Sequence, residues 1–168
     1  MGTDLISKLR HYDPKSVLTN LYYSFLQSFL NYSILNWTCV ASTKLNNIRT
    51  ALKKAVRLIT YSNKYEHTPP LFKTLNILPF DQLLKLRQAT LMWKTINGYV
   101  PSPINELFKV RENTLKFHTP SPSNDFEKLA INFSCPKVWN TNVPETFRKL
   151  QHLNSFTKKY KAHLLQAL

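Results

Sequence analysis

Glycine is almost absent from this chain: Gly2 and Gly98 are the only two among 168 residues. Glycine supplies the left-handed backbone of tight two-residue hairpins, and several glycines are needed for loops that hold a phosphate group against the backbone. A sheet built from hairpins and a glycine-rich nucleotide loop are therefore both disfavoured. The scarcity predicts a mainly α-helical fold, in which loops containing proline and asparagine join the helices.

Apolar residues recur at helical spacing along most of the chain. From Leu18 to Phe29 they follow an i, i+3, i+4, i+7 pattern, after a predicted N-cap at Asp13. Gly98 is predicted to end a long apolar helix. The predicted helices cover residues 3–11, 13–29 with a second, kinked piece at 31–37, 43–60, 68–75, 79–97, 104–108, 144–150 and 155–168. Together they predict a multi-helix bundle.

The segment 109–142 lacks this periodicity. Pro120, Pro122 and Pro136 interrupt a stretch that is rich in serine and asparagine. We predict an extended loop there, with short strands at residues 115–118 and 129–133. The chain is accordingly divided into a helical region (1–108), this irregular segment (109–142) and the C-terminal helices (143–168).

Positive charge is the main compositional indication of function. Twenty-three lysine and arginine residues stand against nine aspartate and glutamate residues, which gives a formal net charge of +14. Such an excess indicates an anionic partner, most commonly nucleic acid. Two basic groups are candidate contacts to a nucleic-acid backbone: Arg49, Lys53, Lys54 and Arg57 on one predicted helix, and Lys158, Lys159 and Lys161 on the last. The alternative is that these residues only keep solvated helix faces soluble.

No complete catalytic constellation can be recognised in the sequence. The four aspartates are scattered, and no cysteine and histidine residues have metal-ligand spacing, so we expect no catalytic residue, no metal and no cofactor. Cys39 and Cys135 are expected to be free thiols. Tyr61, Tyr65 and Tyr99 lie near predicted helix ends, where a tyrosine can stack on a base.

The N-terminal residues and one uncharged segment indicate the compartment of the protein and whether it spans a membrane. Lys8, Arg10 and Lys15 interrupt the apolar N-terminal residues, so we expect no signal peptide and an intracellular location in the nucleus or cytoplasm. Residues 21–40 are uncharged and long enough to span a bilayer. They also contain several amides, however, which are costly in lipid, so a buried helix is the preferred interpretation over a membrane protein.

The sequence resembles the region that follows the catalytic palm in LINE-type, jockey-like non-LTR retrotransposon reverse transcriptases. The resemblance lies in LYYSF (21–25), LNYSILNW (30–37), KKAVRLI (53–59), HTPPLF (67–72), LNIL (75–78), Arg111, PKVWN (136–140), VP (143–144), FTKKYK (156–161) and LL (164–165). These blocks occur in the order that the family has. One departure is Cys135, because the family often has glycine before this proline.

The resemblance implies a thumb-like helical region and a C-terminal extension without the polymerase palm. It implies a chain that is not an enzyme on its own and that binds the backbone of RNA or DNA through its basic helices. The missing palm, or a second copy bound through an exposed apolar face, is a further expected partner. The alternative is an inactive structural relic that binds no nucleic acid.

Overall fold

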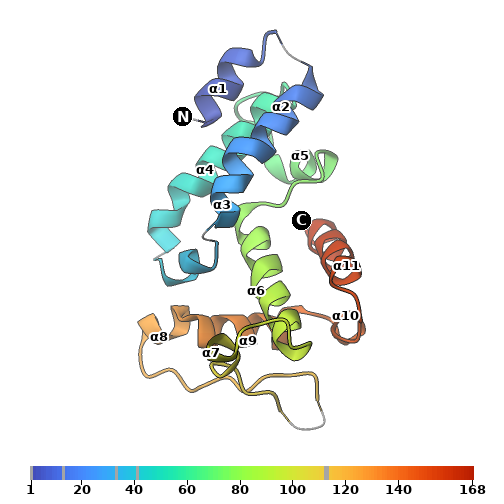
Figure 1. Ribbon diagram of the computed structural model, residues 1–168. Coiled ribbons are helices and arrows are strands. Elements are labelled where there is room, and N and C mark those ends of the chain that lie inside the picture. The colour runs from blue at the N-terminus through green and yellow to red at the C-terminus, as the bar shows by residue number, and fades with distance from the viewer. Residues whose placement is uncertain (1, 13, 33, 41, 112–113) are drawn as a thin grey trace. The chain divides into compact units, whose positions relative to one another are not determined.

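The computed structural model describes residues 2–12, 14–32, 34–40, 42–111 and 114–168. These residues are mainly helical, which confirms the predicted multi-helix fold class. The helices are α1 (Gly2–Leu9), α2 (Lys15–Leu21), η1 (Tyr22–Gln27), α3 (Ser28–Tyr32), η2 (Ile34–Cys39), α4 (Ser42–Ile59), α5 (Thr68–Thr74), α6 (Phe80–Ile96), α7 (Ser102–Asn105), α8 (Asp125–Leu129), α9 (Ile131–Asn142), α10 (Glu145–Arg148) and α11 (Leu153–Gln166) (Figure 1). The predicted N-cap at Asp13 lies outside the described residues.

The chain forms two compact units. The first unit contains Met1–Ile34, Ala41–Asp81 and Leu165–Leu168. The second contains Leu35–Val40 and Gln82–Leu164, so that the long helix α6 begins in the first unit and continues in the second.

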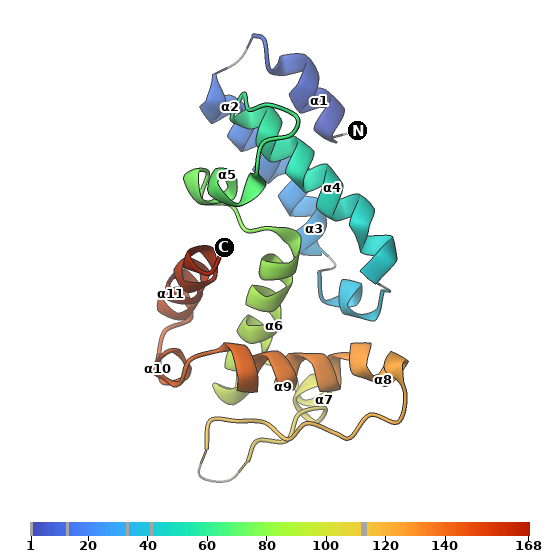
Figure 2. The ribbon, with the colours of Figure 1, turned by 180° about the vertical axis from the view of Figure 1, so that it is seen from behind.

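Helix α4 supplies the core of the first unit. Its buried side chains recur at intervals of three, four and seven residues, which places them on one face of the helix. They are Leu45, Leu52, Ala55, Val56 and Ile59. Helices α1, α2 and α5 pack against α4. The two ribbon views show α1, α2 and α5 around α4 (Figures 1 and 2).

The uncharged segment that precedes α4 is helical but irregular. Helix α2 passes into the π-helical turns of η1 and then into α3, and Ile34–Cys39 forms a 3₁₀ helix. Within the described part of the chain, no helix has both the length and the apolar character that a membrane span requires. Side chains of this segment that are buried, such as Leu18, Tyr22 and Leu30, belong to the core of the first unit.

Aromatic side chains form the core of the second unit. Trp139 of α9 is fully buried, and its ring centroid lies 6.3 Å from that of Phe117 and 5.7 Å from that of Phe156. Phe156 in turn stacks on Trp93 of α6 and on Tyr160, which lies one turn further along α11. Each such pair contributes about 0.5–1.5 kcal/mol beyond the burial of its area. These contacts fix α6, α9 and α11 relative to the loop around Phe117.

The two indole N–H groups in this core are both satisfied by backbone carbonyls. The Nε1 atom of Trp139 donates to the oxygen of Leu115 at 2.7 Å, and that of Trp93 donates to the oxygen of Leu150 at 2.8 Å. Buried indoles normally find such partners, because an unpaired buried donor is costly.

The predicted strand at residues 129–133 is wrong. Leu129 is the last residue of α8, and α9 covers Ile131–Asn142. Helix α9 also tolerates Pro136, because the burial of Cys135 and Trp139 at helical spacing outweighs the one backbone hydrogen bond that a proline removes. At the predicted strand 115–118 the described residues contain only an isolated antiparallel bridge between Val110 and Phe117.

Three helices end in the same way. Gly98 ends α6 with a left-handed φ of 74°, as predicted, and the N–H groups of Gly98 and Tyr99 donate to the carbonyls of Thr95 and Lys94. This pattern is a Schellman cap. Tyr61 and Asn76 occupy the equivalent left-handed position after α4 and α5. In a chain so poor in glycine, larger residues therefore take positions that glycine usually fills.

Candidate nucleic-acid interface

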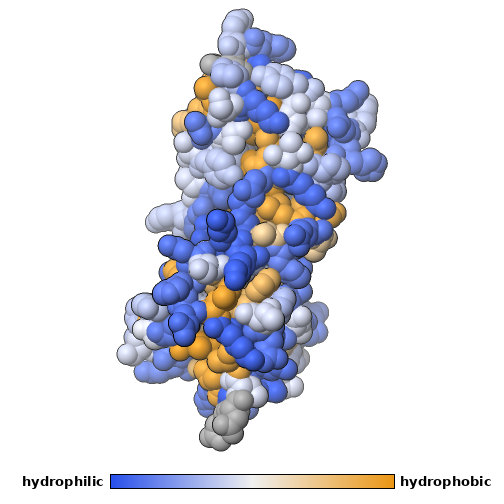
Figure 3. All heavy atoms as spheres, turned by 90° about the vertical axis from the view of Figure 1, so that its right-hand side faces the viewer, coloured by the Kyte–Doolittle hydropathy of each residue, from blue (hydrophilic) through white to orange (hydrophobic). Residues whose placement is uncertain are grey.

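The four predicted basic residues of α4 differ in their surroundings. Lys53 and Lys54 are exposed, whereas Arg49 and Arg57 are half-buried. The helix has no acidic residue of its own. On the face of the molecule drawn in Figure 3, strongly hydrophilic residues occupy much of the surface, and apolar residues reach it between them.

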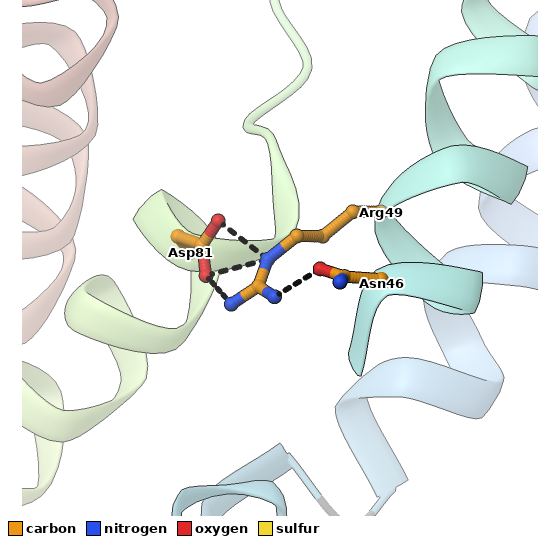
Figure 4. Close-up of polar contacts among 3 residues, drawn as sticks. All are labelled: Asn46, Arg49 and Asp81. Atoms are coloured by element: carbon orange, nitrogen blue, oxygen red, sulfur yellow. Dashed lines mark hydrogen bonds and ion pairs between the residues drawn. The ribbon is translucent and has the colours of Figure 1, made fainter. Parts of the chain in front are cut away.

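Arg49 is paired with a carboxylate from another helix. Its Nη2 atom lies 2.7 Å from Oδ1 of Asp81, in the first turn of α6, and its Nε donates to both oxygens of that carboxylate at 3.2 and 3.0 Å (Figure 4). The Nη1 atom donates to Oδ1 of Asn46 at 2.9 Å. The hydrogen bond to Asp81 raises the pKa of Arg49. The charge of Arg49 is thus balanced inside the chain.

Arg57 holds the loop that follows α4. Its Nε and Nη2 atoms donate to the backbone oxygen of Glu66 at 3.0 and 2.8 Å. Because this acceptor is a neutral carbonyl, these two hydrogen bonds do not balance the positive charge of the guanidinium. The loop is closed further by the N–H of Asn63, which donates to the carboxylate of Glu66, and by the N–H of Tyr65, which donates to the side chain of Asn63.

Lys53 and Arg57 line one groove of about 500 Å³ within the first unit. The loop after α4 forms its rim with Tyr65, Glu66 and His67, and α5 contributes Thr68, Pro69 and Phe72. The remaining lining residues are Pro79 and Leu168. Two cations on α4 therefore face a concave surface, and the carboxylate of Glu66 offsets part of their charge.

Tyr65 is the most exposed of the three tyrosines predicted as stacking candidates. Its side chain is 84% exposed, and Nζ of Lys64 lies 5.8 Å from the centre of its ring. Tyr99 already stacks on Trp93, with centroids 5.8 Å apart and planes 7° from parallel. The ring of Tyr61 lies under the guanidinium of Arg10, 5.4 Å from the ring centre. Only Tyr65 is placed beside the basic groove.

The three lysines of α11 are also not equivalent. Lys158 and Lys159 are exposed, but Lys161 is half-buried, and burial lowers its pKa. Phe156, Tyr160 and Leu164 form the buried face of the helix, as their spacing predicts. Of this predicted group, Lys158 and Lys159 are the side chains that reach solvent most fully.

Sequence reasoning missed the loop residues that complete the groove. Glu66 and His67 line the groove, and their only local signal in the sequence is their position directly after Tyr65. In the part of the chain that the structure describes, no group of three or more histidine, cysteine, aspartate or glutamate residues is arranged to hold a metal ion. Cys39 is an exposed free thiol and Cys135 a buried one.

No family model, no curated protein and no solved structure matches this chain.

Proposed function

We propose that this chain binds the sugar–phosphate backbone of RNA or DNA, and that it corresponds to the non-catalytic region after the palm of a LINE-type reverse transcriptase. The observation that carries the proposal is the groove in which Lys53, Arg57 and Tyr65 come together. Lysine and arginine neutralise phosphates and release counterions, and a tyrosine beside them can stack on a base. The net charge of +14 supplies long-range attraction for any polyanion.

Binding of this kind does not distinguish one base from another. The side chains of the groove are suited to phosphates and to the face of any base, so they position a strand without selecting a sequence. The resemblance places the polymerase palm outside this chain. We therefore infer that the isolated chain holds nucleic acid without extending a primer.

A single substitution on α4 tests the proposal. Lys53→Ala is expected to weaken binding of labelled RNA and DNA about equally for all sequences. It is also expected to flatten the dependence of log K on log salt by about one unit, because one phosphate contact is lost. Fluorescence anisotropy at several salt concentrations measures both quantities. Tyr65→Ala is expected to reduce the affinity for single strands by roughly 1–3 kcal/mol and to leave the salt slope unchanged.

Lys44→Ala is the matched control. Lys44 is also exposed on α4, but it lies nine positions before Lys53, which at about 3.6 residues per turn is the opposite side of the helix. If Lys44→Ala and Lys53→Ala have equal effects, the groove is not the site and only diffuse attraction remains. If the parent chain fails to bind RNA or DNA at low salt, the alternative holds, and the chain is an inactive structural relic.

A further inference from the structure

A second basic pocket lies in the second unit and shares no lining residue with the groove beside α4. It has a volume of about 820 Å³ and lies between the loop that holds Arg111 and Lys116 and the C-terminal end of α10. Arg148 and Lys149 line its other side together with Glu145. Among the described residues that line the pocket, there are thus four cations and one carboxylate. The volume falls within the range of about 300–1,000 Å³ that is typical of small-ligand sites.

The backbone holds Arg111 and Lys116 opposite each other. The N–H of Arg111 donates to the oxygen of Lys116 at 2.9 Å, and the adjacent residues Val110 and Phe117 form the antiparallel bridge. Residues directly opposite in such a pair carry their side chains on the same face, and like charges in this arrangement are destabilising. This placement brings two positive charges to one wall of the pocket, where an anion would relieve their repulsion.

Arg148 is built into the floor of the pocket. It is only 8% exposed, and its Nη2 atom donates to the backbone oxygens of Trp139 and Asn140 at 3.0 and 2.9 Å. Its Nε is buried and has no hydrogen-bond partner among the described residues. Burial lowers the pKa of Arg148. A buried guanidinium whose Nε lacks a hydrogen-bond partner is an expensive arrangement, which a bound anion would make more favourable.

The pKa of Glu145 is lowered by the positive charges around this pocket. Its carboxylate lies 2.7 Å from Nζ of Lys149, and the hydrogen bond from Lys149 is the largest cause that lowers the pKa of Glu145. The charges of Lys149, Arg148 and Lys116 lower it further. A carboxylate at the rim is thus already stabilised by three of the four cations. The cations remain in excess, so the pocket can accept further negative charge.

We propose that this pocket binds the phosphoryl group of a phosphorylated ligand, held by Arg111, Lys116, Arg148 and Lys149. A phosphoryl group presents several oxygens and up to two negative charges, which suits cations that approach from two walls and a floor. A carboxylate ligand would satisfy fewer of them. The site lies in the second unit and does not depend on the groove beside α4. The phosphoryl group belongs either to a free nucleotide or to the end of a nucleic-acid strand.

Titration calorimetry with the full chain tests this proposal. The probes are inorganic tripolyphosphate, ATP, adenosine and an oligonucleotide with or without a 5′-phosphate. Tripolyphosphate and ATP are expected to bind and adenosine is not. The double substitution Arg111→Gln and Lys116→Gln is expected to lower the affinity for tripolyphosphate and for ATP by at least about tenfold, because two charge-assisted contacts are lost. Stronger binding of the 5′-phosphorylated strand than of its unphosphorylated match would assign the group to a strand end, and preference for ATP would assign it to a free nucleotide.

A second double variant controls for net charge. Lys128→Gln with Lys137→Gln also removes two positive charges from the second unit, but neither residue lines the pocket. This variant is expected to bind both probes within about twofold of the parent chain, since distant charges are screened. Equal losses in the two double variants, or no binding of tripolyphosphate to the parent, would overturn the site. Since Lys53→Ala acts in the other unit, its effect on strand binding separates failure here from failure of the proposed function.

Discussion

At the residue scale, Asp81 controls how much of the charge on α4 is available to a ligand. Its carboxylate receives three hydrogen bonds from Arg49. The pair is partly exposed, with side-chain accessibilities of 26% for Arg49 and 54% for Asp81, so it contributes at most about 1 kcal/mol to folding. An interaction of this size is small enough to remove without unfolding the chain, and its removal leaves an uncompensated cation four residues before Lys53.

We expect Asp81→Asn to strengthen nucleic-acid binding. One negative charge disappears close to the groove, which is worth up to roughly 1 kcal/mol, or about fivefold in affinity, at low salt. Fluorescence anisotropy against RNA and DNA measures the change. Asp125→Asn is the matched control, because Asp125 also pairs with a basic residue, Lys128, at 2.7 Å but lies in the second unit. A weaker or unchanged affinity for Asp81→Asn would show that α4 does not meet the strand near Arg49.

Residue partners of this kind lie beyond what sequence patterns predict. The exposure of Lys53, Lys158 and Lys159 follows from helical periodicity alone, because the opposite faces of their helices are apolar. By contrast, Arg49 meets Asp81 across 32 positions of the chain, and only the tertiary fold brings these two residues together. Four basic residues that look alike in the sequence therefore have different partners in the fold.

At the element scale, one face of the η1–α3 segment is apolar and open to solvent. Phe25 and Phe29 are 54% and 67% exposed, and Tyr32 is 94% exposed. Their spacing of i, i+4 and i+7 places them on one side of a helix. A contiguous apolar surface of this kind marks an interaction site or a tendency to associate. The resemblance to the region after the polymerase palm predicts such a face, covered either by the missing palm or by a second copy.

We expect the isolated chain to self-associate through this face. Burying each phenylalanine is worth about 1.5–3 kcal/mol, so the double substitution Phe25→Gln and Phe29→Gln is expected to weaken association strongly. Light scattering over a wide range of protein concentrations measures the oligomeric state. Phe126→Gln serves as the control, because Phe126 is 85% exposed in the second unit, outside this face. A parent chain that stays monomeric at high concentration would contradict the prediction.

Apolar periodicity predicts the helices where no proline interrupts it, but it did not predict α9. Ile131, Cys135 and Trp139 are spaced four residues apart, which is a helical signal, but Pro136 and the surrounding serines and asparagines indicated a loop. Tertiary packing outweighs the local preference for a loop, because the helix buries Trp139 between Phe117 and Phe156. Neither partner is close to it in sequence, so its contribution cannot be read from the segment alone.

At the scale of the whole molecule, the charge is unevenly distributed along the chain. No acidic residue occurs between residues 14 and 65 or between residues 146 and 168. The ion pairs described above, such as Arg49 with Asp81 and Lys149 with Glu145, use only a few of the 23 basic residues. The remaining positive charges repel one another in the folded chain more than in the expanded, unfolded one. This repulsion opposes folding and is relieved by counterions.

We therefore expect the melting temperature to rise with salt in the absence of any ligand. Between about 0.01 M and 0.15 M sodium chloride the Debye length falls from about 30 Å to about 8 Å, which screens most of this repulsion. A gain of about 1 kcal/mol corresponds to a rise of roughly 2–4 °C for a chain of this size. Thermal unfolding followed by circular dichroism measures it. Replacing the exposed Lys158 and Lys159 by glutamine removes two charges, so the variant should melt higher than the parent at low salt and gain less from added salt. A melting temperature that falls with salt would mean instead that ion pairs outweigh the repulsion, and the excess of positive charge would then have no cost for a bound polyanion to relieve.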